Sequence, residues 1–272
     1  MLSVLFWNVH NRPLGPLIAA GAADTGADLV ILTECDDPDM ILPLLNVNTL
    51  RSFSFRKSFD GRFVLFSRLP AGSIDELGAS QGLTFFQLSP PIGMDFLLVA
   101  AHLPSKLIYS DEDQRFFSRM SIITILDYEQ RVGHDRTVLV GDFNMNPFES
   151  GMINVDGFHS TSSRSVASRV TRTVHGQEFK FFYNPMWNLL GDDEAPPGSY
   201  YHTSPSPTGT HWHLLDQVMV RPSVLGALPQ GHVRILTRVG GYDLLRADGR
   251  IDTTVGSDHL PLWFELNFLE EE

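Results

Sequence analysis

The stretch VLVGDFN at residues 138–144 joins an apolar run to polar side chains. Val138–Val140 is short and continuously apolar, which is typical of a strand that is buried on both faces. Gly141 follows, and then come Asp142 and Asn144. We therefore expect a buried strand whose end presents side chains capable of chemistry.

Other apolar runs of strand length are also flanked by polar side chains. Because function is commonly found on loops at strand ends, the repeated pattern predicts one shared site. This expectation requires the first four strands to run one way and the last two the other, so that the polar groups meet at one edge. For any single strand, a residue that merely caps its own strand is the simpler explanation. Val4–Trp7 ends at Asn8, Leu29–Leu32 at Thr33-Glu34, Phe96–Ala101 at His102 and Val138–Val140 at Gly141-Asp142-Phe143-Asn144, whereas Asp216 precedes Val218–Val220 and Asp258-His259 precedes Leu260–Phe264.

Helical patterns separate several of these strands. The clearest covers 111–132, where Ser110 and the acids after it form a helix start and Phe116, Met120, Ile123 and Leu126 recur at helical spacing. Shorter helices are expected at about 14–24 and 39–46. The Pro-, Gly-, Ser- and Thr-rich segment 184–212 predicts a long loop and not a linker, because strand-like runs resume after it. The chain is therefore predicted to be one α/β domain over residues 1–272.

Composition narrows the possible classes of protein. The 272 residues are 43% apolar and 19% charged, which excludes a disordered chain, a coiled coil and a collagen-like repeat. A net charge of −12 argues against avid, non-specific binding to duplex DNA, although an enzyme that meets phosphate through a divalent cation remains compatible. The single cysteine, Cys35, excludes an internal disulfide and a cysteine-based zinc site, and it favours a reducing compartment. We expect a cytoplasmic protein without a membrane span or signal peptide.

The polar residues at the strand ends suggest a chemistry. Carboxylate and amide oxygens suit Mg²⁺ or Mn²⁺ better than a soft metal. With such an ion and imidazoles nearby, the natural reaction is the attack of water on a phosphate ester.

The ordered motifs resemble those of the endonuclease/exonuclease/phosphatase superfamily. The resemblance extends from residue 6 to about 264 and implies a four-layer α/β sandwich with two central mixed sheets. The Gly-Asp-Phe-Asn and Ser-Asp-His motifs are specific in combination. The matching stretches are Phe6–Val9, Leu32–Glu34, Ala101–Leu103, Leu139–Asn144, Leu215–Val218 and Gly256–Leu262.

The resemblance also implies a role for each matched residue. Three residues would hold the divalent metal, and the others would handle protons or the phosphate. By this resemblance, the metal residues are Asn8, Glu34 and Asp258. Asp142 would orient or deprotonate the attacking water, and Asn144 would donate to the phosphate. His259 would contact the scissile phosphate or act as base, Asp216 would orient His259, and His102 would help to protonate the leaving oxygen.

Two positions depart from the family pattern. His10 stands where many relatives have Asp or Asn, so it is either a phosphate contact or simply a loop residue. The carboxylate expected to support His102 is represented only by Asp60. His102 itself disfavours a pure abasic-site repair enzyme, because that branch typically carries Tyr there. A dinuclear metallophosphoesterase is disfavoured too, since the Gly-Asn-His motif of that class is missing from the sequence.

Residues 159–183 carry a local charge of +3 within an acidic chain. We expect Arg164, Arg169 and Arg172 to bind a polyanionic substrate, with a solvated surface loop as the equal alternative. The segment His211-Trp212-His213 could stack a nucleobase, but an anchoring role for Trp212 is favoured.

The sequence therefore predicts a Mg²⁺- or Mn²⁺-dependent phosphodiesterase. A nuclease, most simply an endonuclease that cleaves DNA or RNA, is the favoured interpretation, with nucleic acid as the substrate. The alternative is a phosphatase or phosphodiesterase of a small phosphorylated molecule or a phospholipid head group. A catalytically silent binding module is disfavoured, because a complete set of candidate residues is present. The sequence leaves the oligomeric state open.

Overall fold

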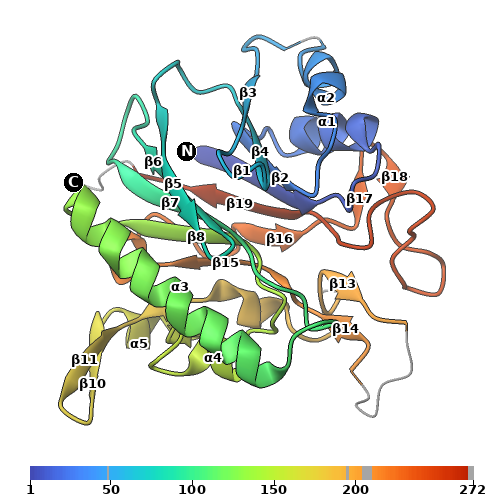
Figure 1. Ribbon diagram of the computed structural model, residues 1–272. Coiled ribbons are helices and arrows are strands. Elements are labelled where there is room, and N and C mark those ends of the chain that lie inside the picture. Colours follow the sequence, from blue (N-terminus) through green and yellow to red (C-terminus); the bar gives the residue numbers. More distant parts are fainter. Residues whose placement is uncertain (48, 194–195, 204–209, 269–272) are drawn as a thin grey trace. The chain divides into compact units, whose positions relative to one another are not determined.

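The computed structural model describes residues 1–47, 49–193, 196–203 and 210–268 (Figure 1). Contacts between residues divide the chain into two compact units. Unit 1 comprises Met1–Ala71, Leu189–Asp216 and Pro229–Leu266, and unit 2 comprises Gly72–Asn188, Gln217–Leu228 and Asn267–Glu272. The prediction that these segments form one domain stays a prediction.

Unit 1 is built on a six-stranded sheet with the order β16-β19-β1-β2-β4-β3. Strand β1 pairs in parallel with β2 and antiparallel with β19, so the sheet is mixed. Apolar residues fill its central strands, as expected for strands covered on both faces. The strands are β1 (Leu2–Asn8), β2 (Leu29–Thr33), β3 (Ser54–Lys57), β4 (Phe63–Ser67), β16 (Val233–Ile235) and β19 (Leu262–Leu266).

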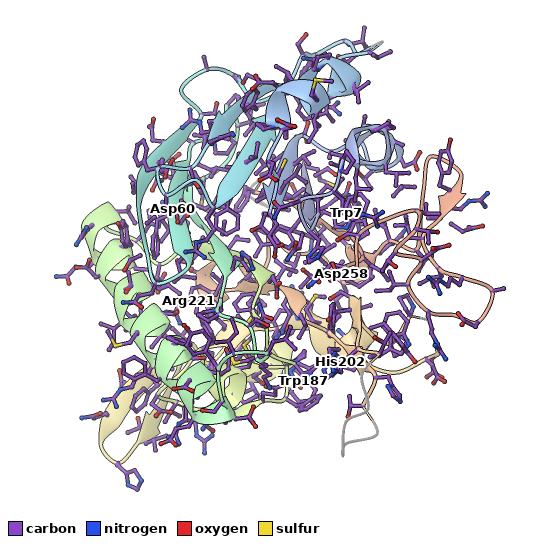
Figure 2. The ribbon with its side chains drawn as sticks, turned by 45° about the vertical axis from the view of Figure 1, so that its right-hand side comes forward. Trp7, Asp60, Trp187, His202, Arg221 and Asp258 are labelled. Carbon is purple, nitrogen blue, oxygen red and sulfur yellow. The ribbon has the colours of Figure 1, made fainter. Side chains whose placement is uncertain are left out.

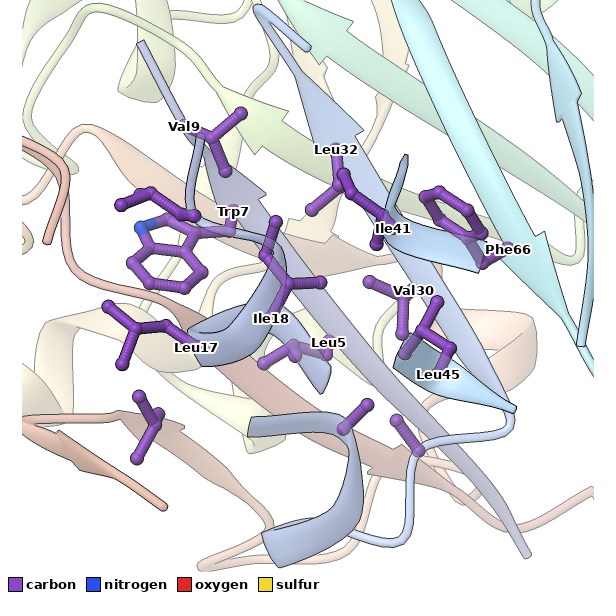
Figure 3. Packing of buried hydrophobic residues seen from close by; sticks show 14 of the residues in the cluster. Leu5, Trp7, Val9, Leu17, Ile18, Val30, Leu32, Ile41, Leu45 and Phe66 are labelled. Carbon is purple, nitrogen blue, oxygen red and sulfur yellow. The ribbon is translucent and has the colours of Figure 1, made fainter. Parts of the chain in front are cut away.

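Helices α1 (Gly15–Asp24) and α2 (Pro38–Leu45) belong to the same unit. Each carries Pro in its first turn, where the missing N–H is not needed. Their apolar residues share one core cluster with residues of β1, β2 and β4 (Figure 3). Trp7 and Ile18 are almost completely buried in this cluster. Two short hairpins complete the unit, β13–β14 (Tyr200–Tyr201, Trp212–His213) and β17–β18 (Arg238–Val239, Tyr242–Asp243).

Unit 2 is built on a seven-stranded sheet with the order β5-β6-β7-β8-β15-β12-β9. It is also mixed, because β7 pairs in parallel with β8 and antiparallel with β6. The predicted fold class, α/β with two central mixed sheets, is thus confirmed. The strands are β5 (Ile74–Ser80), β6 (Leu83–Leu88), β7 (Phe96–His102), β8 (Thr137–Asp142), β9 (Ser160–Thr161), β12 (Phe182–Tyr183) and β15 (Asp216–Val220).

The long helix α3 (Asp111–Val132) has the predicted bounds. Ser110 and Asp113 form a reciprocal capping box, and Gly133 ends the helix in the left-handed conformation. The apolar residues that recur at helical spacing do not mark its buried face, because Phe116 is 58% exposed and Ile123 is 52% exposed. The buried face instead combines polar residues with Ile125 and Tyr128, which pack with residues of β6, β7 and β8. Figure 1 shows α3 lying along this sheet.

Smaller elements fill the rest of unit 2. They are α4 (Ser150–Ile153), α5 (Arg164–Ala167), the 3-10 helix η2 (Pro222–Val224) and the hairpin β10–β11 (Thr171–Val174, Gln177–Lys180). The predicted loop 184–212 contains the 3-10 helix η1 (Pro185–Leu189) and β13, while residues 194–195 and 204–209 lie outside the described part. Within the described ranges, no helix has both the length and the apolar character of a membrane span.

Candidate active-site groups

The ends of β1 and β2 bring Asn8 and Glu34 together. The parallel register pairs Asn8 with Thr33, so Glu34 follows directly at the same sheet edge. The Asn8 side chain donates from Nδ2 to Glu34 Oε1 at 3.0 Å and accepts at Oδ1 from the His10 backbone N–H at 3.0 Å. Because Asn8 is buried, these bonds fix the Glu34 carboxylate relative to the strand.

Backbone strain is concentrated at the same strand ends. His10, Asn11 and Glu34 have φ values of 49°, 52° and 52°, in the left-handed region that is unfavourable for side chains with a Cβ. The Asn11 N–H donates to the Glu34 carbonyl at 2.7 Å and so links the two strained loops. Strain of this kind is found most often at functional sites, where surrounding contacts hold it.

His10 lies between two carboxylates. Its Nδ1 is 3.4 Å from Glu34 Oε2 and 3.8 Å from Asp258 Oδ1. Asp258 is carried by the loop before β19, and Arg12 holds this loop by hydrogen bonds to the carbonyls of Thr253 and Gly256. His10 thus belongs to the same group as the predicted metal residues, whichever of its two predicted roles is correct.

The donor set of this group fits a hard divalent cation. The group offers the carboxylates of Glu34 and Asp258, whose side chains are 28% and 29% exposed, together with the Asn8 amide. Partly exposed carboxylates that are held in place by neighbours can exchange water for an ion without a large rearrangement. Oxygen donors of this type match Mg²⁺ and Mn²⁺, and the nearby imidazole of His10 favours Mn²⁺ more than Mg²⁺.

A second feature of unit 1 is the pair formed by Asp216 and His259. His259 Nδ1 lies 2.8 Å from Asp216 Oδ2, and both side chains are buried. The Asp216 backbone N–H donates to Ser199 Oγ at 3.0 Å. A carboxylate bound at Nδ1 keeps the proton on that nitrogen, so Nε2 becomes the nitrogen that can accept a proton or contact phosphate.

The backbone around His259 is also held from several sides. The Trp7 indole N–H donates to the His259 carbonyl at 2.8 Å, and the Leu260 N–H donates to the Ser199 carbonyl at 2.8 Å. Trp7, Ser199 and Arg12 were not among the residues predicted from the sequence. Their partners are far away in sequence, so no local pattern pointed to them; the place of Trp7 directly before Asn8 was the one available signal.

In unit 2, β7 and β8 place His102 opposite Asp142. The two residues are register partners at the ends of parallel strands, and His102 Nε2 lies 3.9 Å from Asp142 Oδ2. Asp142 is buried, whereas His102 is partly exposed. At the preceding pair, a Cβ on Gly141 would lie 1.9 Å from the Ala101 carbonyl oxygen, so this close approach requires glycine.

Asn144 is folded back onto the same group. Its φ is 51°, its backbone N–H donates to Asp142 Oδ1 at 2.9 Å, and its side-chain amide donates to the Leu103 carbonyl at 2.9 Å. One of the two side-chain amide protons of Asn144 is therefore already used in a hydrogen bond. Gln217 supports this loop from β15, because its amide donates to the Met145 carbonyl at 2.6 Å.

Gln217 is in turn fixed by Asn184, which donates to its Oε1 at 2.8 Å. Neither of these two amide side chains was predicted from the sequence as a supporting residue. Asp60, the predicted partner of His102, belongs to unit 1, where it accepts hydrogen bonds from Ser58 Oγ and from Arg62. Its partnership with His102 stays a prediction.

The three predicted substrate-binding arginines have different surroundings. The Arg164 guanidinium donates to the carbonyls of Leu228 and Leu225 at 2.8 and 2.5 Å and lies over the Tyr183 ring. Arg169 and Arg172 are exposed, and Arg172 lies on β10. The structure therefore gives Arg164 a role in packing and leaves two arginines at the surface.

Cys35, next to Glu34, is half-buried. Burial raises the pKa of its thiol to about 11, and the opposing influence of Lys57 is smaller. The thiol therefore stays protonated near neutral pH and is a poor nucleophile or metal ligand.

Residues 5–259 match the model of the Endonuclease/Exonuclease/phosphatase family. The fold is similar to that of a mannosyl-6-phosphatase from Bacteroides thetaiotaomicron (16% identity, TM-score 0.61, covering 98% of this chain and 100% of the other). It is also similar to D. rerio TDP2 in complex with a single-strand DNA product (19% identity, TM-score 0.55, 98% of each chain). The catalytic domain of human nocturnin with a bound sulfate anion is similar as well (14% identity, TM-score 0.55, covering 98% and 94%).

No curated protein sequence matches the chain significantly. The family match covers nearly the whole chain, and the chain belongs to the endonuclease/exonuclease/phosphatase family. The solved structures are less than 25% identical to this chain, so they establish the fold and not the substrate.

Proposed function

We propose that the protein is a divalent-metal-dependent phosphoric ester hydrolase, and specifically a nuclease that cleaves phosphodiester bonds of DNA or RNA. The observation that carries this proposal is the buried Asp216–His259 pair at 2.8 Å. A buried carboxylate that holds an imidazole is a proton-handling device, and the nearby carboxylates of unit 1 supply oxygens for an ion. Family membership supports the hydrolase class.

In this proposal, Asn8, Glu34 and Asp258 hold Mg²⁺ or Mn²⁺, with His10 beside them. The bound ion supplies charge neutralisation at the phosphate. His259, oriented by Asp216, presents Nε2 to the phosphate or to a proton.

In unit 2, Asp142 orients or deprotonates the attacking water in this proposal. Asn144 donates its remaining amide proton to the phosphate, and His102 protonates the leaving oxygen. We also propose a cytoplasmic location, which the single cysteine supports.

A second candidate is a phosphatase that acts on a small phosphorylated molecule. One observation favours it: Arg164 is committed to carbonyls of its own unit, which reduces the positive charge available to a polymeric substrate. The likeness to a mannosyl-6-phosphatase is compatible with this candidate.

A substrate panel separates the candidates. Single-stranded DNA, duplex DNA, RNA, mannose 6-phosphate and bis(p-nitrophenyl) phosphate would each be incubated with Mg²⁺, with Mn²⁺ and with EDTA. The proposal expects cleavage of a nucleic acid with either ion and none in EDTA. Cleavage of mannose 6-phosphate alone would favour the phosphatase, and full activity in EDTA would contradict the metal-dependent hydrolase.

Metal binding is tested independently of turnover by isothermal titration with Mn²⁺. Glu34→Gln should weaken binding by at least about tenfold, because it replaces one of the charged oxygen donors. Glu149→Gln is the control, since Glu149 is a partly buried carboxylate of unit 2 that pairs with Lys106. Equal affinity for both variants would contradict the metal assignment.

The role of Asp142 is tested by Asp142→Asn. Its kcat should fall by about 10²–10⁴-fold while KM changes little, because a residue that acts on the water contributes to the transition state. Asp156→Asn is the matched control, since Asp156 makes an ordinary surface ion pair with Arg115 at 2.9 Å.

The role of the basic segment is tested by a joint substitution of Arg169 and Arg172 by Ala. For a nuclease, KM for oligonucleotides should rise and the salt dependence should flatten by roughly 0.7–0.9 per lost phosphate contact. Hydrolysis of bis(p-nitrophenyl) phosphate should stay the same, because that substrate carries no second phosphate. No change for oligonucleotides would favour a solvated surface segment.

A further inference from the structure

The hairpin β13–β14 carries a cluster of aromatic rings next to His259. Tyr200 on β13 forms a bridge with the His259 backbone, and the two ring centres are 4.9 Å apart. His213 is the register partner of Tyr200 across the hairpin, and His202 follows two residues after Tyr200. The ring centres of Tyr200, His202 and His213 are separated by 6.3 to 6.5 Å, so these three rings form a nearly equilateral triangle.

The two faces of this hairpin differ in character. Tyr201 and Trp212, which alternate with Tyr200 and His213, pack against the hydrophobic core of unit 1. The anchoring role predicted for Trp212 is therefore confirmed. Because side chains alternate along strands, Tyr200 and His213 point away from that core. Apolar anchoring thus leaves the opposite face of the hairpin with two imidazoles and a phenol beside His259.

The orientation of the rings restricts what this face can bind. The planes of His202 and His213 are at 78°, those of Tyr200 and His213 at 47°, and those of Tyr200 and His202 at 31°. A nucleobase stacks on a flat, continuous aromatic surface, which these inclined rings do not provide. Inclined imidazoles instead present ring edges, and the N–H groups on those edges are donors to oxyanions.

We propose that His202 and His213, supported by Tyr200, bind a second phosphate group of the substrate, next to the phosphate that is hydrolysed. This inference rests on the proposed function, because it takes His259 as a contact of the scissile phosphate. Tyr200 contacts His259 as well as both of the other imidazoles. The second phosphate therefore belongs to the part of the substrate that lies directly next to the phosphate that is hydrolysed. All three residues of the triangle are half-buried, which gives them a fixed position and some access to solvent (His202 is labelled in Figure 2).

The charge of the chain makes such donors useful. At a net charge of −12, and with Glu34 and Asp258 in the same unit, a substrate with several phosphates is repelled unless each phosphate finds a donor. A divalent ion meets only the phosphate that it contacts. Imidazole donors on the hairpin would offset the repulsion of the next phosphate, and so would select substrates with two phosphates over those with one.

The experiment compares substrates that differ by a single phosphate. The p-nitrophenyl ester of thymidine 5′-phosphate would be hydrolysed with and without an additional 3′-phosphate, in Mn²⁺. A second pair, mannose 6-phosphate and mannose 1,6-bisphosphate, distinguishes a small sugar phosphate from a nucleotide as the source of the second phosphate. The variants are His202→Asn and His213→Asn, which keep a polar side chain and remove the imidazole.

His211→Asn is the matched control. His211 belongs to the same hairpin and is exposed; its ring stacks on Tyr201 with ring centres 5.7 Å apart, and its Nδ1 lies 3.2 Å from the backbone carbonyl oxygen of His202, a contact that an Asn side-chain amide can also make. We expect His202→Asn and His213→Asn each to raise KM about tenfold for one of the bisphosphorylated substrates, with kcat and the KM of its one-phosphate counterpart nearly unchanged. His211→Asn should behave like the parent. If an Asn variant melts early, the corresponding Gln variant replaces it, because Gln is closer in size to histidine.

Two results would overturn the proposal. One is a parent enzyme with equal KM for substrates with one and with two phosphates. The other is an equal effect of all three histidine variants, which would indicate a role in hairpin stability. If no substrate is hydrolysed, the proposed function fails separately, and titration calorimetry with inorganic pyrophosphate then decides the inference: binding must weaken in His202→Asn and His213→Asn but not in His211→Asn.

Discussion

Gly141→Ala tests whether the close approach of β7 and β8 positions the pair His102 and Asp142. Gly141 directly precedes Asp142, and its register partner Ala101 directly precedes His102. A Cβ at Gly141 would lie 1.9 Å from the Ala101 carbonyl oxygen, 2.6 Å from its carbonyl carbon and 2.7 Å from its nitrogen. These are backbone atoms of a neighbouring strand, so no side-chain rotation relieves the overlap.

The size of the effect follows from these distances. Cβ contacts below 3.0 Å are essentially never seen, so the strands must separate by at least 3.0 − 1.9 = 1.1 Å. Overpacking of this kind costs about 1–3 kcal/mol of the free energy of unfolding. A displacement of about 1 Å beside reacting groups can lower the rate by about 10²-fold. We therefore expect a moderate loss of stability together with a large loss of kcat.

The assay combines urea unfolding, followed by circular dichroism, with kcat for bis(p-nitrophenyl) phosphate in Mn²⁺. The matched control is Gly133→Ala, because Gly133 also has a positive φ (+74°) but has no atom within 4 Å of its added Cβ. The control should lose about 1–2 kcal/mol from backbone strain and keep its kcat. If Gly141→Ala unfolds like the control and keeps its rate within about threefold, the steric argument is wrong.

Three further predictions concern buried or half-buried side chains of the two units. Glu129→Ala should lower the free energy of unfolding by about 3–5 kcal/mol in urea titrations, because the fully buried Arg221 donates to Glu129 Oε1 at 2.7 Å and would lose this charge partner. The double variant Glu129→Leu/Arg221→Met should lose less stability than Glu129→Ala, and the opposite order would refute this explanation. Trp7→Phe should lower the free energy of unfolding by about 1–3 kcal/mol and should also lower kcat, because the buried His259 carbonyl loses the indole N–H as a donor. An unchanged kcat would show that this hydrogen bond does not position His259. Burial raises the pKa of the Cys35 thiol from its ordinary value of 9.0 to about 11, so its reaction with a disulfide reagent should have a pH midpoint near 11. The stability that the buried thiol contributes should be present below about pH 9 and lost as pH rises to 11, and a reaction midpoint near that of a free thiol would contradict this.

The strands could be predicted because a strand that is buried on both faces is a short, continuous apolar run in the sequence. The apolar runs Val4–Trp7 and Phe96–Ala101 lie within β1 and β7, and the polar residues after them lie at the strand ends as expected. Strand β5 was not predicted, since its sequence IDELGAS has little apolar character.

The apolar residues at helical spacing do not identify the buried face of α3, and the reason is physical. Its buried side contains Gln114 and Ser118, whose donor groups are paired: Ser118 Oγ donates to the Gln114 carbonyl at 2.9 Å, and the Gln114 amide nitrogen donates to the Pro104 carbonyl, although Gln114 Oε1 has no hydrogen-bond partner. Once such groups are paired, their burial costs little, and the hydrophobic pattern no longer identifies the inner face.

The candidate side chains could be named from motifs, but the residues that position them could not. Trp7 and His259 are 252 positions apart, and Gln217 and Met145 are 72 positions apart. A hydrogen bond over such a separation leaves no periodic signal in a single sequence. Only the folded chain shows that an indole or an amide acts on a distant loop.

The left-handed backbone at His10, Glu34 and Asn144 has a consequence for the descent of this chain. For an L-residue, this conformation costs roughly 1–2 kcal/mol, and glycine would avoid that cost. Under the proposed function, selection for stability and selection for chemistry therefore favour different residues at these positions. A duplicated copy that was released from its reaction would gain stability by drifting toward glycine at each of them, so the residues that descendants keep there would record how long the chemistry was needed.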